Sequence, residues 1–296
     1  IFGPIRALND SLPPRRRQFI LWNAYTGKTC NGKPQYPIEM TASSDNQAPQ
    51  GKNGNQGSLD PEDVARFEAL ADEWWDPDGP FRPLHLFNPV RIGFIRDQIC
   101  GHFGRDPKTK LPLDGLNILD IGCGGGLVAE PMARLGATVT GIDPSPKNTA
   151  TAQTHGTSMG LNITYKAQTA EQTASDDVRF DVVLMLEVLE HVADMDVFMD
   201  GATKLVAPKG LLFAATINRT SKAYALAIVG AEYILGWVPR GTHDWNRFIK
   251  PEELTENLAR RDFQIKALSG LTYGPIHRRW KTSNDQSVNY ILSATA

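Results

Sequence analysis

A glycine-rich loop constrains the fold of this chain more than any other feature of its sequence. The stretch LDIGCGGG, residues 119–126, follows the apolar strand pattern NILDIG and precedes the helix pattern LVAEPMARLG. Asp120 ends the expected strand, and Gly122, Gly124 and Gly126 form the turn. Glycines at such a turn let the backbone approach a ligand, because no Cβ stands in the way. The loop therefore predicts a strand–turn–helix unit built to hold a small molecule.

Strand and helix patterns alternate from about residue 116 to the C-terminus. This alternation predicts an α/β fold with a doubly wound, seven-stranded, mostly parallel, Rossmann-like sheet. The expected strands are 117–122, 137–143, 162–167, 180–186, 210–217, 263–271 and 287–294. The expected helices of this part are 127–136, 144–160, 194–205 and 251–261.

Two further helices are expected ahead of the glycine loop, as an N-terminal helical extension. The first begins near Ser58, with Ser58 or Asp60 as its N-cap and Pro61 in its first turn. The second runs from Pro89 to about residue 103. Residues 1–57 are expected to be a disordered or non-native extension, and 58–296 a single domain. Residues 1–39 suit either an organellar leader or sequence upstream of a start at Met40, which we favour.

The bulk composition excludes some classes of function. The formal net charge is −2, which argues against a protein that coats nucleic acid, so no nucleic-acid partner is expected. The three cysteines lie far apart, at positions 30, 100 and 123, and offer neither a CxxC metal or redox pair nor a disulfide framework. A reducing compartment such as the cytoplasm is the natural expectation.

The glycine spacing distinguishes two classes of cofactor. A dinucleotide loop reads G-x-G-x-x-G and would need glycine at Leu127. This loop reads D-x-G-x-G-x-G instead, the form of the nucleoside-sulfonium loop in class I methyltransferases. Asp143 ends the next strand, where a carboxylate can accept hydrogen bonds from both ribose hydroxyls. S-adenosyl-L-methionine is therefore the expected methyl donor, and a tight turn without a ligand is the alternative.

An acidic and histidine cluster follows the strand FDVVLML. Glu187, Glu190 and His191 stand at positions i, i+3 and i+4, which would put them on one face of a helix. Such a face could hold Mg²⁺ or another divalent cation. The cation would bind both oxygens of a catechol and lower the pKa of its hydroxyl group. Alternatively, His191 accepts the phenol proton directly as a general base. A purely structural role for the helix start is the third interpretation.

An unusually apolar segment lies between the fifth strand and the late helix. Residues 224–238 contain a single charge, Glu232, and would span only about 22 Å as a helix, too little to cross a bilayer. Within an insert of about 219–245, this segment is either a membrane-facing lid that admits a lipid-tailed substrate, or a helix buried in the core or in a dimer interface.

Taken together, these stretches resemble the ubiquinone biosynthesis O-methyltransferases, bacterial and mitochondrial. The resemblance covers about residues 63–296. Its most specific parts are FEALADEWWDPDGPFRPLHLFNPVRIGFI and GAEYILGWVPRGTHDW, since the glycine loop and LEVLEHV are shared by many methyltransferases. Residues 1–57 have no recognised counterpart, and the loop 104–115 looks longer than is usual in the family.

The resemblance implies methylation of ring hydroxyls on polyprenylated catechols or quinols, including 3-demethylubiquinol. It implies that Arg91, Gly122, Asp143 and Leu186 contact S-adenosylmethionine. The family's divalent-metal positions fall on Glu187, Glu190 and His191, of which Glu190 and His191 are also the expected catalytic residues. It further implies membrane lipid and a ubiquinone-biosynthesis enzyme complex as partners. We expect a cytoplasmic enzyme at the inner membrane, on the matrix side if residues 1–39 are a transit peptide.

Two rival functions remain open at this stage. One is another small-molecule methyltransferase, for instance one that methylates a quinone carbon. The other is a non-catalytic module that uses the fold to bind a partner. His243 and Asp244 follow the apolar segment, where they would line a substrate entrance.

Overall fold

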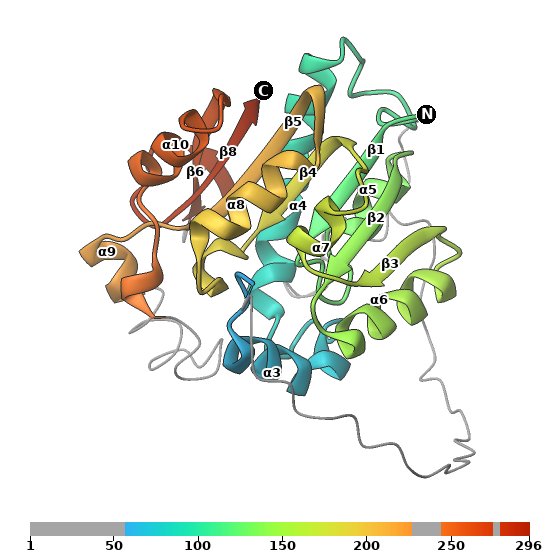
Figure 1. Cartoon of the computed structure of the whole chain (residues 1–296), viewed down its shortest axis with the longest axis horizontal. Helices are drawn as coiled ribbons and strands as arrows, with labels where there is room; N and C mark the ends of the chain where they lie inside the picture. Colours follow the sequence, from blue (N-terminus) through green and yellow to red (C-terminus); the bar gives the residue numbers. More distant parts are fainter. Residues whose placement is uncertain (1–56, 227–243, 275–278) are drawn as a thin grey trace, which may run out of the picture. The chain divides into compact units, whose positions relative to one another are not determined.

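The computed structural model of the chain describes residues 57–226, 244–274 and 279–296 (Figure 1). Residues 1–56 of the expected extension 1–57 and residues 227–243 of the expected insert lie outside these ranges, and the boundaries of both stay predictions. None of the helices in the described ranges is both long and apolar enough to cross a bilayer.

An eight-stranded sheet, with strand order β3-β2-β1-β4-β5-β8-β6-β7, forms the centre of the described chain. The strands are β1 (Asn117–Ile121), β2 (Thr138–Asp143), β3 (Ile163–Ala167), β4 (Phe180–Leu186), β5 (Val206–Ile217), β6 (Gln264–Gly274), β7 (Arg279–Ser283) and β8 (Asn289–Thr295). β1 to β5 pair in parallel, whereas β8 pairs antiparallel to both β5 and β6. The expected doubly wound, mostly parallel sheet is confirmed. The strand count exceeds the expected seven because β7, a polar strand paired with β6, was not recognised.

Helices cover both faces of the sheet, as Figure 1 shows for α8 in front and α4 behind. The helices and helical turns are α3 (Pro61–Ala69), η1 (Ala71–Glu73), α4 (Arg82–His102), α5 (Ala129–Arg134), α6 (Pro146–Ser158), α7 (Ala170–Ala174), η2 (Leu189–His191), α8 (Met195–Lys204), α9 (Ser221–Ala223), η4 (Trp245–Arg247) and α10 (Pro251–Ala259).

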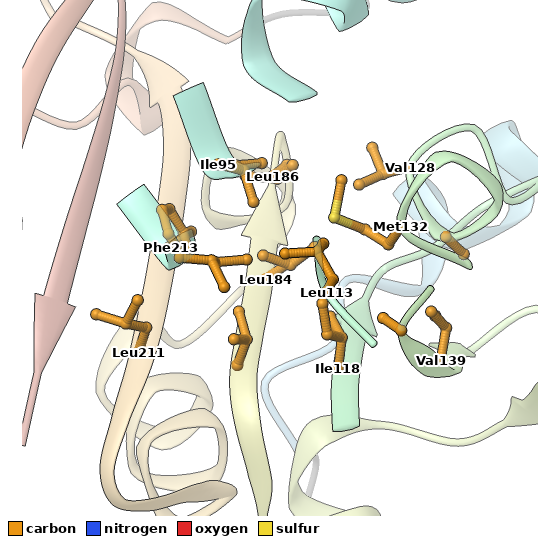
Figure 2. Close-up of a cluster of buried hydrophobic side chains, with 14 of the residues drawn as sticks. Ile95, Leu113, Ile118, Val128, Met132, Val139, Leu184, Leu186, Leu211 and Phe213 are labelled. Atoms are coloured by element: carbon orange, nitrogen blue, oxygen red, sulfur yellow. The ribbon is translucent and has the colours of Figure 1, made fainter. Parts of the chain in front are cut away.

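Alternate residues of the central strands enter two separate cores. Ile118 and Leu184 point into the core that α4 and α5 cover (Figure 2). Leu119 and Met185, their chain neighbours, point into the core beneath α8 and α10. This alternation is the two-residue period of a strand, and burial on both faces explains why the strands read as continuous apolar runs.

The N-terminal helical extension is present, with one difference from the expected bounds. Asp60 caps α3 by accepting from the backbone N–H groups of residues 62 and 63. α4 begins at Arg82 rather than at Pro89, so Pro89 lies inside the helix. An interior proline removes one helix hydrogen bond and costs about 3 kcal/mol in isolation. Burial of the apolar side chains Phe87, Ile95 and Ile99 on the same helix offsets that cost.

Candidate active site

The carboxyl ends of β1, β2 and β4 meet where the strand order reverses, which is the usual ligand position in such sheets. Gly122, Gly124 and Gly126 follow β1 with φ angles of +66°, +50° and +88°. Side chains rarely adopt these angles. A Cβ at Gly122 would also come within 2.5 Å of Val188 Cγ2. The glycines of the loop are therefore required by backbone conformation and by close packing.

Asp143 ends β2 and ties the glycine loop to the start of α6. Its Oδ2 accepts from the Gly124 N–H at 3.0 Å, and its Oδ1 accepts from Ser145 N–H at 2.9 Å and Asn148 Nδ2 at 3.1 Å. Burial raises the pKa of Asp143. The three hydrogen bonds act in the opposite direction but do not cancel the effect of burial. Each carboxylate oxygen has two lone pairs, so Oδ1 is saturated by its two donors and Oδ2 keeps capacity for a ribose hydroxyl.

Asp120 and Arg91 are both buried beside the loop. Burial raises the pKa of Asp120 to about 7, although the nearby Arg91 opposes this shift. Asp120 Oδ2 is buried without a hydrogen-bond partner in the described chain. An unsatisfied buried carboxylate oxygen is costly, so its position suits a ligand that donates a hydrogen bond, such as an ammonium group.

Arg91 reaches this position from α4, and only 2% of its surface is exposed. It donates from Nε to Asn88 Oδ1 at 3.1 Å and from Nη1 to Glu187 Oε1 at 3.3 Å. Its guanidinium lies over the Phe87 ring, 4.2 Å from the centroid. A buried guanidinium with one long carboxylate contact can exchange that contact for the carboxylate of a ligand.

The acidic and histidine cluster does not form the expected helix face. β4 continues to Leu186, Glu187 has a positive φ of 56°, and only the three-residue turn η2 follows. Glu187 and Glu190 therefore do not stand in the i, i+3 relation of one helix, and the expectation of a shared face is wrong.

Each member of the cluster has a different partner. Glu187 meets Arg91, and Glu190 Oε2 accepts from the Thr216 hydroxyl at 2.8 Å. His191 Nδ1 lies 3.3 Å from Asp63 Oδ2. Burial raises the pKa of Glu190 to about 7, and burial lowers the pKa of His191. His191 is thus favoured as a neutral imidazole, the form that accepts a proton.

The same three side chains are the expected donor set for a divalent cation. A cation needs several oxygen or nitrogen atoms that converge on one point. No group of three or more His, Cys, Asp or Glu side chains with that property occurs in the described ranges. As arranged here, Glu187, Glu190 and His191 do not fit a metal ion.

Three expected residues remain: Leu186, Asp244 and His243. Leu186 is the last residue of β4, and its side chain points into the core near Ile95 (Figure 2), so only its backbone faces the site. Asp244 caps the exposed turn η4. His243 lies outside the described residues.

Two tryptophans that cover the glycine loop were not recognised as site residues. Trp74 Nε1 donates to Asn148 Oδ1 at 3.0 Å, and Trp75 Nε1 donates to the Gly125 carbonyl at 2.9 Å. Trp74 also stacks on Phe81, with ring centroids 3.7 Å apart. Both tryptophans belong to the motif EWWD. No local pattern links this motif to a loop about 50 residues further along the chain, so the contact could not be predicted from the sequence.

The comparisons agree with this geometry. A family model described as a methyltransferase domain matches residues 96–268. The magnesium protoporphyrin IX methyltransferase of Synechocystis PCC 6803, solved with bound SAH, shares the fold at a TM-score of 0.53 and 20% identity, over 79% of this chain and 93% of that one. The fold and the site thus define an S-adenosylmethionine-dependent methyltransferase.

Sequence relatives narrow the class further. The ubiquinone biosynthesis O-methyltransferase of Methylobacterium nodulans is 54% identical over 80% of this chain and 95% of its own length. The protein of the same name from Caulobacter vibrioides is 54% identical, with the same coverage, and that from Rhizobium etli is 53% identical over 81% and 97%. The chain belongs to the family of ubiquinone biosynthesis O-methyltransferases, and it is an O-methyltransferase that uses S-adenosylmethionine.

Proposed function

We propose that the enzyme transfers the methyl group of S-adenosylmethionine to ring hydroxyls of polyprenylated catechol or quinol intermediates of ubiquinone synthesis, including 3-demethylubiquinol. The observation that carries this substrate is the 54% identity to a named relative over 95% of its length. A non-catalytic module has no need for the buried, unsatisfied carboxylate of Asp120 beside the glycine loop.

The proposed donor site uses the residues around the glycine loop. Asp143 accepts from the ribose, and the backbone at Gly122 and Leu186 lies against the nucleoside and the methionine chain. Arg91 pairs with the methionine carboxylate and releases Glu187, while Asp120 accepts from the ammonium group. These contacts hold the methyl carbon in line with the acceptor oxygen, which removes much of the entropic barrier to transfer.

His191 is the proposed catalytic base. The catechol oxygen attacks the methyl carbon, the carbon–sulfur bond breaks, and the phenol proton passes to Nε2 of His191. The products are the methyl ether and S-adenosylhomocysteine. Glu190 lies next to the base and stabilises the imidazolium that forms. This scheme assigns no step to a metal ion, because the side chains of Glu187, Glu190 and His191 do not converge on one point in the described structure.

The acceptor's isoprenoid tail is proposed to enter beside the apolar segment. The described start of this segment and the residue Trp245 beyond it expose large apolar side chains: Tyr224 is 48% exposed, Leu226 53% and Trp245 37%. Exposed aromatic and apolar groups of this kind suit a lipid interface. Peripheral contact with the inner membrane, and membership of a ubiquinone-biosynthesis complex, belong to the same proposal.

The first experiment measures methyl transfer from labelled S-adenosylmethionine to a short-tailed 3-demethylubiquinol, with the product identified as an O- or a C-methyl compound. We expect the O-methyl product, and loss of turnover in His191→Ala at saturating donor. Asp143→Ala serves as the control that fails in donor binding. A C-methyl product, or no transfer by a protein that binds the donor, would contradict the proposal.

A second arm adds EDTA, after purification in a chelator. Direct proton transfer to His191 predicts that the initial rate stays within twofold. Loss of transfer that Mg²⁺ restores would show that Glu187, Glu190 and His191 regroup around a cation when substrates bind. That result would leave the substrate assignment in place and replace the metal-free step.

A further inference from the structure

We propose that Asp63 is a positioning residue that orients His191, and that Arg247 holds Asp63 in place. The inference rests on the proposed role of His191 as the base. It concerns a contact between residues 128 positions apart, at the junction of α3, η2 and η4. Asp63 was not recognised from the sequence.

The contact joins Asp63 Oδ2 to His191 Nδ1 at 3.3 Å. The Asp63 side chain is 10% exposed and that of His191 17%. A neutral imidazole carries one proton, and a carboxylate can only accept. The proton therefore sits on Nδ1, and the lone pair is left on Nε2, the nitrogen that a base needs. None of the described residues hydrogen-bonds Nε2.

A residue of α3 also packs against the imidazole ring of His191. Phe67 meets it edge-on, with ring centroids 4.9 Å apart and planes at 84°. Phe67 lies one turn after Asp63, so a single helix supplies both the hydrogen-bond acceptor and the packing surface. Together they restrict rotation of the ring about its side-chain bonds.

The backbone on either side of this contact is fixed. Leu59 and Val192 form an isolated antiparallel bridge, and the Ala193 N–H donates to the Ser58 carbonyl at 2.7 Å. The start of α3 is therefore attached to the chain immediately after η2. Asp63 and His191 approach each other on a frame that does not depend on their own contact.

Arg247 connects the same pair to the chain that follows residue 243. Its Nη1 donates to Asp63 Oδ2 at 3.0 Å and its Nη2 to Asp60 Oδ2 at 2.6 Å. Arg66 forms a further ion pair with Asp63, through Oδ1. With an arginine on each oxygen, the carboxylate of Asp63 has a defined orientation toward His191. The Arg247 side chain is 38% exposed, so its contribution is geometric more than energetic.

The test compares three variants of the full-length enzyme. Asp63→Ala should lower kcat by roughly 10- to 100-fold and leave the Kd for S-adenosylmethionine within twofold. Asp63→Asn should recover part of kcat, because its amide oxygen still accepts from Nδ1. Asp60→Asn is the matched control: asparagine keeps the N-cap of α3 and weakens only the second contact of Arg247, while Arg247 Nη1 still donates to Asp63. Its kcat should stay within twofold of the wild type.

A spectroscopic readout separates orientation from stability. In ¹⁵N-histidine spectra, with the signal assigned by His191→Gln, the wild type should show the Nδ1–H tautomer, and Asp63→Ala should populate Nε2–H. An unchanged kcat or tautomer in Asp63→Ala, no recovery in Asp63→Asn, or an equal loss in Asp60→Asn would overturn the inference. Full turnover by His191→Ala would instead show that the base role itself is wrong.

Discussion

The indole of Trp74 lies directly against the backbone of Gly124. A Cβ built on Gly124 would come within 2.5 Å of the Trp74 Cη2 atom, and the glycine has a positive φ of 50°. The N-terminal helical extension, to which Trp74 belongs, thus contacts the tip of the glycine loop. The loop leaves room for the indole only because residue 124 has no side chain.

Gly124→Ala should therefore weaken donor binding. A positive φ costs a side chain about 1–2 kcal/mol, and Trp74 has to move as well. We expect the Kd for S-adenosylmethionine, measured by calorimetry, to rise about tenfold or more. Gly104→Ala is the matched control, because Gly104 has a similar φ of +64° but nothing within 4 Å of its Cβ position. Equal effects of the two variants on binding would contradict the role of Trp74.

The pH dependence of donor binding should report on Asp120. Burial raises the pKa of its carboxyl to about 7, and the ionised form is the one that pairs with an ammonium group. Acidification from pH 7 to 5.5 protonates Asp120, while the donor's amino group stays protonated throughout. The Kd should therefore rise as the pH falls, by up to about tenfold per unit.

Burial also raises the pKa of Glu190 to about 7. The variant Asp120→Asn therefore separates the effect of Asp120 on donor binding from that of Glu190. The variant should bind S-adenosylmethionine weakly and with a much smaller pH slope. A wild-type slope that survives in Asp120→Asn would assign the titration to another group.

The same substitution should stabilise the ligand-free protein at alkaline pH. The folded-state pKa of Asp120 lies above its usual value of 3.8, so the folded state binds the proton more tightly than the unfolded state. That contribution is fully present below about pH 4 and is lost progressively as the pH rises from there through about 7. Asp120→Asn should thus raise the free energy of unfolding by ~1–4 kcal/mol at pH 8. Urea denaturation at about pH 4, near the usual pKa of the carboxyl, where the gain should largely disappear, is the control.

Glu190→Ala should lower kcat by roughly 10- to 100-fold with little change in donor affinity. The carboxylate lies beside the proposed base and accepts from the Thr216 hydroxyl, away from the glycine loop. Thr216→Val tests whether that hydrogen bond or the carboxylate itself matters, and it should retain most of kcat. Single-turnover rates and calorimetry measure the two quantities. Loss of donor binding in Glu190→Ala would indicate a structural role instead.

Much of the fold follows from local sequence patterns. The apolar runs of β1, β4 and β5 occur because both faces of the sheet are covered, and the glycine loop occurs because the backbone there needs positive φ. β7 escaped recognition because an edge strand with polar side chains shows no such run. The acid cluster was misplaced because a three-residue turn leaves no periodicity, so its spacing resembled a longer helix.

The sequence by itself determined the α/β class, the position of the glycine loop, Asp143 as the acid after the second strand, and the family. These features depend on residues close together in the chain, where spacing translates directly into geometry. Only the tertiary structure decided which polar groups meet: Trp74 with Asn148, Arg91 with Glu187, and Asp63 with His191, at separations of 74, 96 and 128 residues. Such contacts depend on how helices ahead of the sheet pack across its carboxyl edge, and no local spacing encodes that packing.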